Sequence, residues 1–102
     1  MAKVYVTEFA NRGQDGNAQF MQMGLEPQTA NQTVAIGAGS VQSSSFNSLT
    51  TFVRVHTDAI CSIEFGTNPT ATADTRRLAA NQTEFFSVPK GQAFKVAVIT
   101  NT

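Results

Sequence analysis

The chain has few of the residues on which catalytic, metal and disulfide chemistry depends. Its 102 residues include no tryptophan, one cysteine, one histidine and one tyrosine. A single cysteine cannot form an internal disulfide, and a lone cysteine with a lone histidine cannot supply a Cys-rich or multi-His metal site. We therefore expect no metal and no other cofactor. A Ser–His–Asp arrangement has only one histidine available to it.

Charge is also scarce. Charged residues make up 14% of the chain, against about 25% in typical soluble domains, and seven basic residues balance seven acidic ones. Nonspecific nucleic-acid binding requires clustered positive charge, so no nucleic-acid partner is expected. No apolar run reaches the length of about 18 residues that a membrane span needs. The first residues lack the apolar core of a signal peptide, so no membrane partner is expected either.

Neutral polar residues and residues that favour strands are abundant. Ser, Thr, Asn and Gln occupy 35 of the 102 positions. Apolar residues alternate with a period of two far more often than they follow a helical period, which predicts strands. The clearest strands are at 51–57, 59–65, 83–88 and 94–99, followed by 3–9, 18–23, 32–36, 41–46 and 76–79, with polar loops at 11–17, 37–40 and 66–74.

Two hairpins are predicted from the clearest strands. A turn near Asp58 would pair 51–57 with 59–65 and place Arg54 beside Glu64 on the polar face of the pair. A second turn, at Val88-Pro89-Lys90-Gly91, would pair 83–88 with 94–99, because proline and glycine suit these positions of a type I turn.

The fold class follows from the number and spacing of the strands. Seven or eight strands from these nine segments, roughly 8–14 residues apart, are typical of an antiparallel β-sandwich or β-barrel. No segment is long enough to serve as a linker between domains. We therefore expect residues 1–102 to form one all-β sandwich domain of about seven to eight strands.

The histidine and the cysteine each have a structural interpretation beside the functional one. His56 has Asp58 and Ser62 nearby in the sequence, but strand alternation places it on the polar face, where a histidine is expected without catalysis. Cys61 falls among the inward positions of its strand and is interpreted as a small core residue. The chain is therefore not expected to be an enzyme.

Two segments are candidates for contacts with a partner. In the run from Phe20 to Leu25, alternation cannot bury Phe20 and Met21 on one face, and methionine suits adaptable binding surfaces, although core packing stays an alternative. Arg76 and Arg77 would point to opposite faces of a strand, so they would not line one patch. The interface candidates are Phe20, Met21, Met23, Leu25, Arg76 and Arg77.

The second half of the chain resembles a known class of proteins. The segments FVRVHTDAICSIEFGTNPTAT at 52–72, EFFSVPKGQ at 84–92 and VAVI at 96–99 resemble small all-β virion proteins of tailed phages and prophages. The resemblance is greatest to capsid decoration or cement proteins and covers roughly residues 50–100. It includes no motif of functional residues, so no residue roles are carried over.

The resemblance implies a jelly-roll-like sandwich and a non-enzymatic structural role. It further implies a homo-oligomer that binds the major capsid protein, lies on the capsid surface of the virion, and is made in the bacterial cytoplasm. A tail or head–tail connector component is an alternative, because such subunits are also rich in strands. A small carbohydrate- or receptor-binding sandwich is another, although Tyr5 is the only tyrosine for stacking on a sugar.

Overall fold

The computed structural model describes residues 2–14, 16–17, 20–24 and 26–102, and for 12–14 and 20–23 it describes the backbone alone. This part of the chain holds ten strands and no helix long and apolar enough to cross a membrane. The strands are β1 (Lys3–Phe9), β2 (Arg12–Gln14), β3 (Phe20–Gly24), β4 (Ala30–Ala35), β5 (Val41–Gln42), β6 (Phe52–Thr57), β7 (Cys61–Gly66), β8 (Arg76–Leu78), β9 (Thr83–Ser87) and β10 (Lys95–Thr100).

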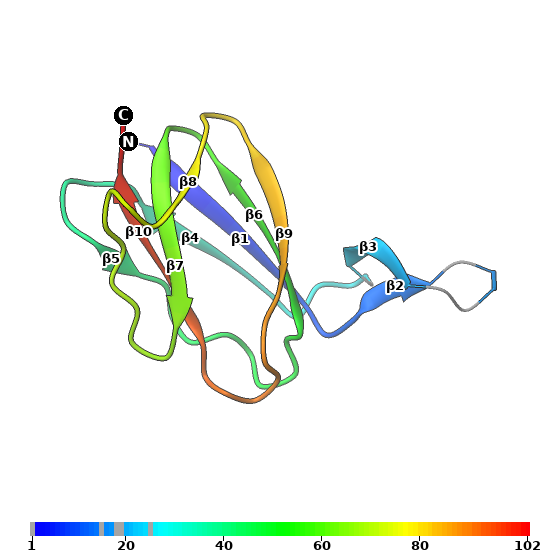
Figure 1. The fold of residues 1–102 in the computed structure, drawn as a ribbon. Helices are drawn as coiled ribbons and strands as arrows, with labels where there is room; N and C mark the ends of the chain where they lie inside the picture. Colours follow the sequence, from blue (N-terminus) through cyan, green and yellow to red (C-terminus); the bar gives the residue numbers. More distant parts are fainter. Residues whose placement is uncertain (1, 15, 18–19, 25) are drawn as a thin grey trace.

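Eight of these strands form two antiparallel sheets that pack as a sandwich (Figure 1). The first sheet has the strand order β4-β1-β6-β9, and the second sheet has the order β5-β10-β7-β8. The prediction of an antiparallel all-β sandwich with about seven to eight strands is confirmed. The jelly-roll arrangement stays a prediction.

The core lies between the two sheets and is built from the inward positions of the alternating strands. Val4 and Val6 on β1, Val53 and Val55 on β6, and Ile63 on β7 are all at most 1% exposed. Burying a side chain of this size contributes about 1.5–3 kcal/mol relative to leaving it in water. The alternation seen in the sequence therefore identifies the inward residues correctly.

The predicted hairpin between β6 and β7 is wrong. β6 lies between β1 and β9 in the first sheet, whereas β7 lies between β10 and β8 in the second. Arg54 is therefore opposite Thr7 and Phe85. Glu64 is opposite Ala97, so the predicted Arg54–Glu64 pair does not form.

The predicted hairpin between β9 and β10 is wrong for the same reason. β9 pairs with β6, and β10 pairs with β7 and β5, so the connection through Pro89 and Gly91 joins the two sheets. Gly91 has φ 73°, a conformation that glycine adopts without strain. Two consecutive alternating strands bury the same residues whether they pair side by side or face each other, so alternation alone cannot distinguish these arrangements.

Part of the outer face of the second sheet is covered by the loop between β7 and β8. Gln42 Nε2 donates hydrogen bonds to Asn68 Oδ1 at 2.9 Å and to Pro69 O at 2.8 Å. Asn101 Nδ2 donates to Ala73 O at 3.2 Å. Ala97 points outward from this sheet and is nevertheless fully buried. The loop therefore covers part of this outer face, whereas Glu64 and Arg77 on the same face stay exposed.

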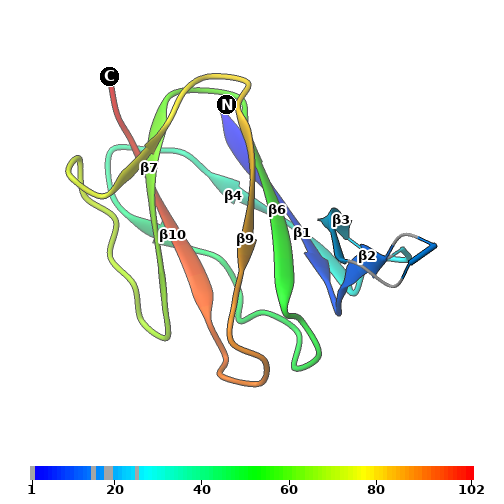
Figure 2. The same cartoon turned by 45° about the vertical axis from the view of Figure 1, so that its right-hand side comes forward.

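A two-stranded hairpin projects from the end of the sandwich opposite to the chain termini (Figures 1 and 2). We call residues 12–24, which contain β2 and β3, the arm. The arm lies between β1 and β4 in the chain, and its strands pair Arg12 with Gly24 and Gln14 with Phe20. It contributes to the elongated shape of the molecule, whose principal extents are 44 × 26 × 22 Å.

The arm corrects one prediction and refines another. Residues 11–17 were expected to form only a polar loop, but Arg12–Gln14 is a strand. The strand predicted at 18–23 is found as Phe20–Gly24, with 18 and 19 outside the described residues. Pairing between the two halves of the arm stabilises both, which a reading of each segment alone does not reveal.

Candidate functional site

The outer face of the first sheet stays accessible, whereas that of the second sheet is partly covered by the β7–β8 loop. Strand register defines its outward positions, which we call the outer face: Lys3, Tyr5, Thr7, Phe9, Asn31, Thr33, Ala35, Phe52, Arg54, His56, Thr83, Phe85 and Ser87. All of these are exposed or partly exposed except Phe9 and Phe52. None of them is acidic, and two of them, Lys3 and Arg54, are full cations.

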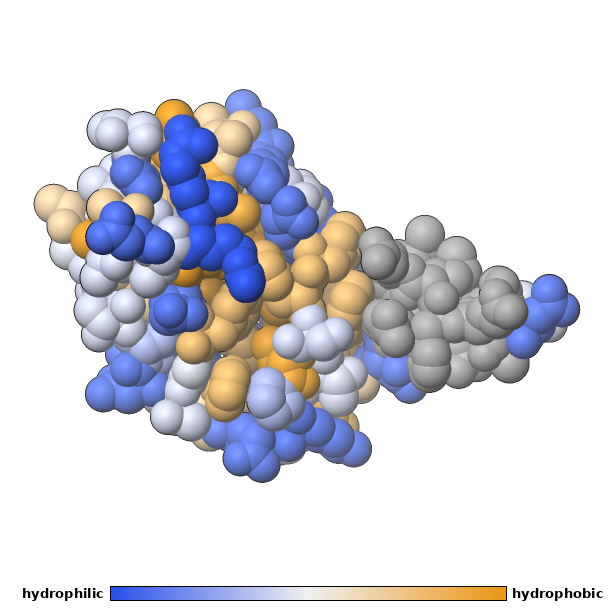
Figure 3. Space-filling view, in the orientation of Figure 1, coloured by the Kyte–Doolittle hydropathy of each residue, from blue (hydrophilic) through white to orange (hydrophobic). Residues whose placement is uncertain are grey.

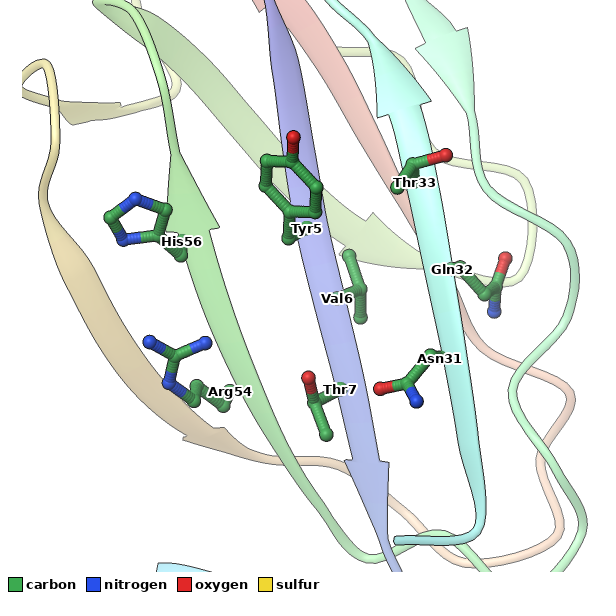
Figure 4. Close-up of a pocket in the computed structure, with 8 residues that line it drawn as sticks. All are labelled: Tyr5, Val6, Thr7, Asn31, Gln32, Thr33, Arg54 and His56. Atoms are coloured by element: carbon green, nitrogen blue, oxygen red, sulfur yellow. The ribbon is translucent and has the colours of Figure 1, made fainter.

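A shallow hollow of ≈ 370 Å³ lies on this outer face (Figure 4). Three neighbouring strands, β4, β1 and β6, provide its walls. Its lining is Tyr5, Val6, Thr7, Asn31, Gln32, Thr33, Arg54 and His56. Its side chains include hydroxyl, amide, imidazole and guanidinium groups, so the hollow offers a ligand both hydrogen-bond donors and acceptors, with the guanidinium as a donor alone.

Arg54 is the most exceptional side chain of the hollow. It is partly buried, and among the described residues it makes no hydrogen bond or ion pair. Its neighbours in the adjacent strands are Thr7 and Phe85, and its neighbours on its own strand are Phe52 and His56, so it has no acidic side chain beside it. A guanidinium group carries five N–H donors and is always charged.

His56 is positioned by neutral groups. Its Nδ1 shares a hydrogen bond of 2.8 Å with Thr83 Oγ1, and its ring lies 6.4 Å from that of Tyr5. Ser62 lies in the other sheet, where it is buried and accepts a hydrogen bond of 2.7 Å from Asn101 Nδ2. The structure therefore does not bring His56 and Ser62 together as a catalytic pair, although they are near each other in the sequence.

Metal ligands are not gathered either. Within the described ranges, no group of three or more His, Cys, Asp or Glu side chains could hold a metal ion. Cys61 is buried as predicted, its Sγ lies 3.5 Å from Thr57 Oγ1, and burial raises the pKa of its thiol. A thiol held protonated in this way is a poor nucleophile at neutral pH.

An aromatic cluster forms where the arm joins the outer face. The rings of Phe9 and Phe52 lie 6.3 Å apart, and those of Phe52 and Phe85 are stacked at 5.5 Å. Phe9 and Phe52 are each only 4% exposed although they point outward, whereas Phe85 is 39% exposed. A Cβ added at Gly24 would overlap the ring of Phe9, so β3 lies directly against this ring.

Apolar surface also follows β9, the outermost strand of its sheet, toward the base of the arm (orange in Figure 3). Phe85 and Phe86 lie on opposite faces of β9. The guanidinium of Arg76 lies 4.9 Å from the centre of the Phe86 ring. The centre of the Phe65 ring also lies 4.9 Å from the centre of the Phe86 ring. Arg76 therefore partly shields an aromatic side chain at the open edge of the sandwich.

The six predicted interface residues are found in two different places. Phe20, Met21 and Met23 lie on β3 of the arm, where the backbone alone is described, and Leu25 lies outside the described residues. Arg76 and Arg77 are both exposed on β8 of the second sheet. Arg77 Nε donates a long hydrogen bond of 3.4 Å to Thr102 O. The two arginines point to opposite faces, in agreement with their adjacent positions on a strand.

Glu8, which was not among the residues singled out from the sequence, is completely buried. Its carboxylate accepts hydrogen bonds from Asn47 N at 2.7 Å, Thr50 Oγ1 at 2.9 Å and Gln32 Nε2 at 2.8 Å. The signal was present, because Val4, Val6 and Glu8 follow one alternating series and point inward together. These bonds fasten the segment before β6 to β1, so Glu8 has a structural role.

Comparison with known proteins does not place this chain in a family. No protein-family model, no curated protein and no solved structure matches this chain. The function must therefore be argued from the residues and their arrangement.

Proposed function

We propose that this protein is a non-enzymatic structural subunit of a tailed-phage virion. In this proposal it is a capsid decoration or cement protein that binds the major capsid protein and copies of itself. The resemblance of residues 50–100 to such proteins supports the proposal, and so does the sandwich fold on which the resemblance depends.

One observation carries the proposal: the two outer faces of the sandwich are built differently. The outer face of the second sheet is partly covered by the chain's own β7–β8 loop, and Ala97 on this face is fully buried, although Glu64 and Arg77 stay exposed. The first sheet keeps an accessible outer face, and the arm extends away from the sandwich next to it (Figure 2). A subunit that sits on a lattice needs such an accessible face and benefits from a projecting element that reaches a neighbour.

The composition of the surface favours repeated weak contacts. The chain has no net charge, so copies of it do not repel one another strongly at close range. Each neutral hydrogen bond adds little, but many equivalent subunits on one shell multiply the effect, because multivalency raises net affinity without new contacts. Decoration of a symmetric shell is an arrangement in which such contacts suffice.

The proposal is tested by adding the purified protein to phage capsids stripped of their accessory proteins. We expect saturable binding with a fixed number of copies per shell and a higher rupture temperature of the shell. Heat-unfolded protein serves as the control. Binding to isolated tails or connectors instead of shells would replace this proposal by that of a tail or connector component. Failure to bind any virion part would contradict the proposal.

A carbohydrate-binding module is the second candidate, favoured by one observation. Tyr5 is 40% exposed beside the hollow, where Asn31 and Thr33 could hydrogen-bond a sugar that stacks on its ring. A glycan array distinguishes this candidate from the first. A specific hit that is lost in Tyr5→Ala would favour carbohydrate binding.

A further inference from the structure

Arg54 has no acidic side chain beside it among the described residues of its own chain. Its cross-strand and same-strand neighbours are all uncharged or, for His56, titratable, and no outward position of the first sheet carries a carboxylate. The other full cation of the outer face, Lys3, differs in this respect. Asp58 N donates a hydrogen bond to Lys3 O at 3.1 Å, which brings an acidic residue to that end of the sheet.

The surroundings of Arg54 would strengthen its interaction with an anion. The side chain is partly buried next to Phe52 and Phe85, whose rings are stacked at 5.5 Å, and it lines a hollow of ≈ 370 Å³. Apolar neighbours reduce the screening of charge by water. Thr7 and Asn31 lie on the same hollow and offer further donors beside the guanidinium.

We propose that the hollow beside Arg54 binds an aspartate or glutamate side chain of the partner protein, with Arg54 as the main donor. This inference rests on the proposed function, because it identifies what the outer face recognises on a capsid shell. A carboxylate matches the planar fork of a guanidinium with two parallel hydrogen bonds. The hydroxyl of Thr7 and the amide of Asn31 satisfy the remaining lone pairs of such a carboxylate.

Two other ligand classes fit the face less well. A nucleic acid would need several clustered cations. The outer face carries only two, Lys3 and Arg54, and Arg54 lies opposite Thr7, four residues along β1 from Lys3. A neutral sugar would stack on Tyr5 but would leave the positive charge of Arg54 without a counter-charge. An acidic protein segment uses both the single charge and the surrounding donors.

The first test uses a short peptide with one glutamate flanked by threonine and alanine, titrated into the ¹⁵N-labelled protein. We expect saturable NMR shifts at Tyr5, Thr7 and Arg54, and no such shifts with the glutamine version of the peptide. Arg54→Gln should weaken binding at least about tenfold, because a charge-assisted hydrogen-bonded pair is lost. Lys90→Gln, an exposed cation in the β9–β10 connection, is the matched control and should leave the affinity unchanged.

A third variant separates charge from geometry. Arg54→Lys keeps the positive charge but loses the fork, so its affinity should fall between those of the wild type and Arg54→Gln. Wild-type binding should weaken as salt is added. The proposal is overturned if the glutamate peptide causes no saturable shift, if Arg54→Gln binds as well as the wild type, or if inorganic phosphate or sialyllactose binds the hollow in place of the peptide.

The shell-binding assay, run on the same variants, distinguishes failure of the site from failure of the proposed function. Shell binding by the wild type that falls at least tenfold in Arg54→Gln, with Lys90→Gln unaffected, supports both proposals. Shell binding that is equal in all three proteins overturns the carboxylate site and leaves the proposed function standing. Peptide binding without shell binding supports the site and contradicts the proposed function.

Discussion

At the scale of single residues, the structure shows how a charge can be part of a β-sandwich core. Glu8 is fully buried without an ion-pair partner in the described chain, and three donors from Asn47, Thr50 and Gln32 converge on its carboxylate. Thr50 is also within 3.0 Å of Thr29 through their hydroxyl oxygens. The buried carboxylate is therefore an organising centre for the irregular segment before β6.

Replacing Glu8 by alanine should destabilise the protein by about 2–4 kcal/mol, because several buried donors would lose their acceptor. Glu8→Gln should also destabilise it, because one of its side-chain groups becomes a donor facing donors. Urea unfolding followed by circular dichroism measures both. Glu64→Ala, at an exposed position of β7, is the control and should change the free energy of unfolding by no more than about 0.5 kcal/mol. A Glu8→Ala variant as stable as this control would refute the structural role.

Cys61 provides a prediction about pH. Burial raises the pKa of its thiol above the ordinary value of 9.0, so the unfolded chain releases this proton before the folded chain does. Below pH 9.0 both states keep the proton and Cys61 adds no pH dependence. Above it the free energy of unfolding should fall, and this fall should be smaller in Cys61→Ala. Denaturant unfolding of both proteins in reductant, from neutral to alkaline pH, measures this difference. Parallel curves of unfolding free energy against pH for the two proteins would contradict the prediction.

At the scale of strands, the connections matter more than the strands themselves. β6 to β7 and β9 to β10 cross from one sheet to the other, so residues close in sequence face each other through the core. The arm behaves differently, because its two strands pair locally, and at its base Gly24 lies against Phe9. The direction of the arm therefore depends on this contact.

Gly24→Ala should loosen the arm from the sandwich, because the added methyl group would overlap the Phe9 ring. The cost of such overpacking is about 1–3 kcal/mol. Hydrogen exchange should become faster in the arm while the amides of β6 and β7 keep their protection. Gly37→Ala, where an added Cβ has nothing within 4 Å, is the matched control. Unchanged exchange of the arm amides in Gly24→Ala would show that this contact does not hold the arm.

At the scale of the whole molecule, the chain is asymmetric. One sheet is partly covered by the β7–β8 loop, the other keeps an acid-free outer face, and the arm extends beside that face (Figure 2). The core residues of the described chain all come from the sandwich strands and their connections. The sandwich therefore has a core that does not depend on the described part of the arm.

Deleting residues 12–24 should leave a folded sandwich that binds capsid shells poorly. β1 and β4 are antiparallel neighbours, and Thr29 N donates to Glu8 O at 2.7 Å, so a short connection can still join them. Exposure of Phe9 and Phe52 should lower the free energy of unfolding by about 1.5–3 kcal/mol for each ring fully exposed. Circular dichroism and shell binding measure the two effects. Loss of folding, or shell binding equal to that of the full chain, would contradict the prediction.

The local alternation of apolar and polar residues was sufficient to predict much of the fold. Alternation along the chain located most strands and the inward series Val53, Val55 and Ile63, and it predicted the burial of Cys61, because a strand presents its side chains to two faces whatever its partners are. The same alternation predicts that Glu8 points inward. What makes a buried carboxylate stable there is a set of donors such as Asn47, which is far away in the sequence.

The pairing of the strands and the accessibility of the outer face depend on contacts between distant segments. Whether Val55 faces Ile63 within one sheet or across a sandwich makes no difference to the burial of either, so no local signal separates the two arrangements. The difference between the two outer faces likewise arises because the β7–β8 loop folds over part of the second sheet and not over the first. Arg54 is without an acidic neighbour because Glu64, its expected partner, belongs to the other sheet, and that depends on the packing of the whole chain.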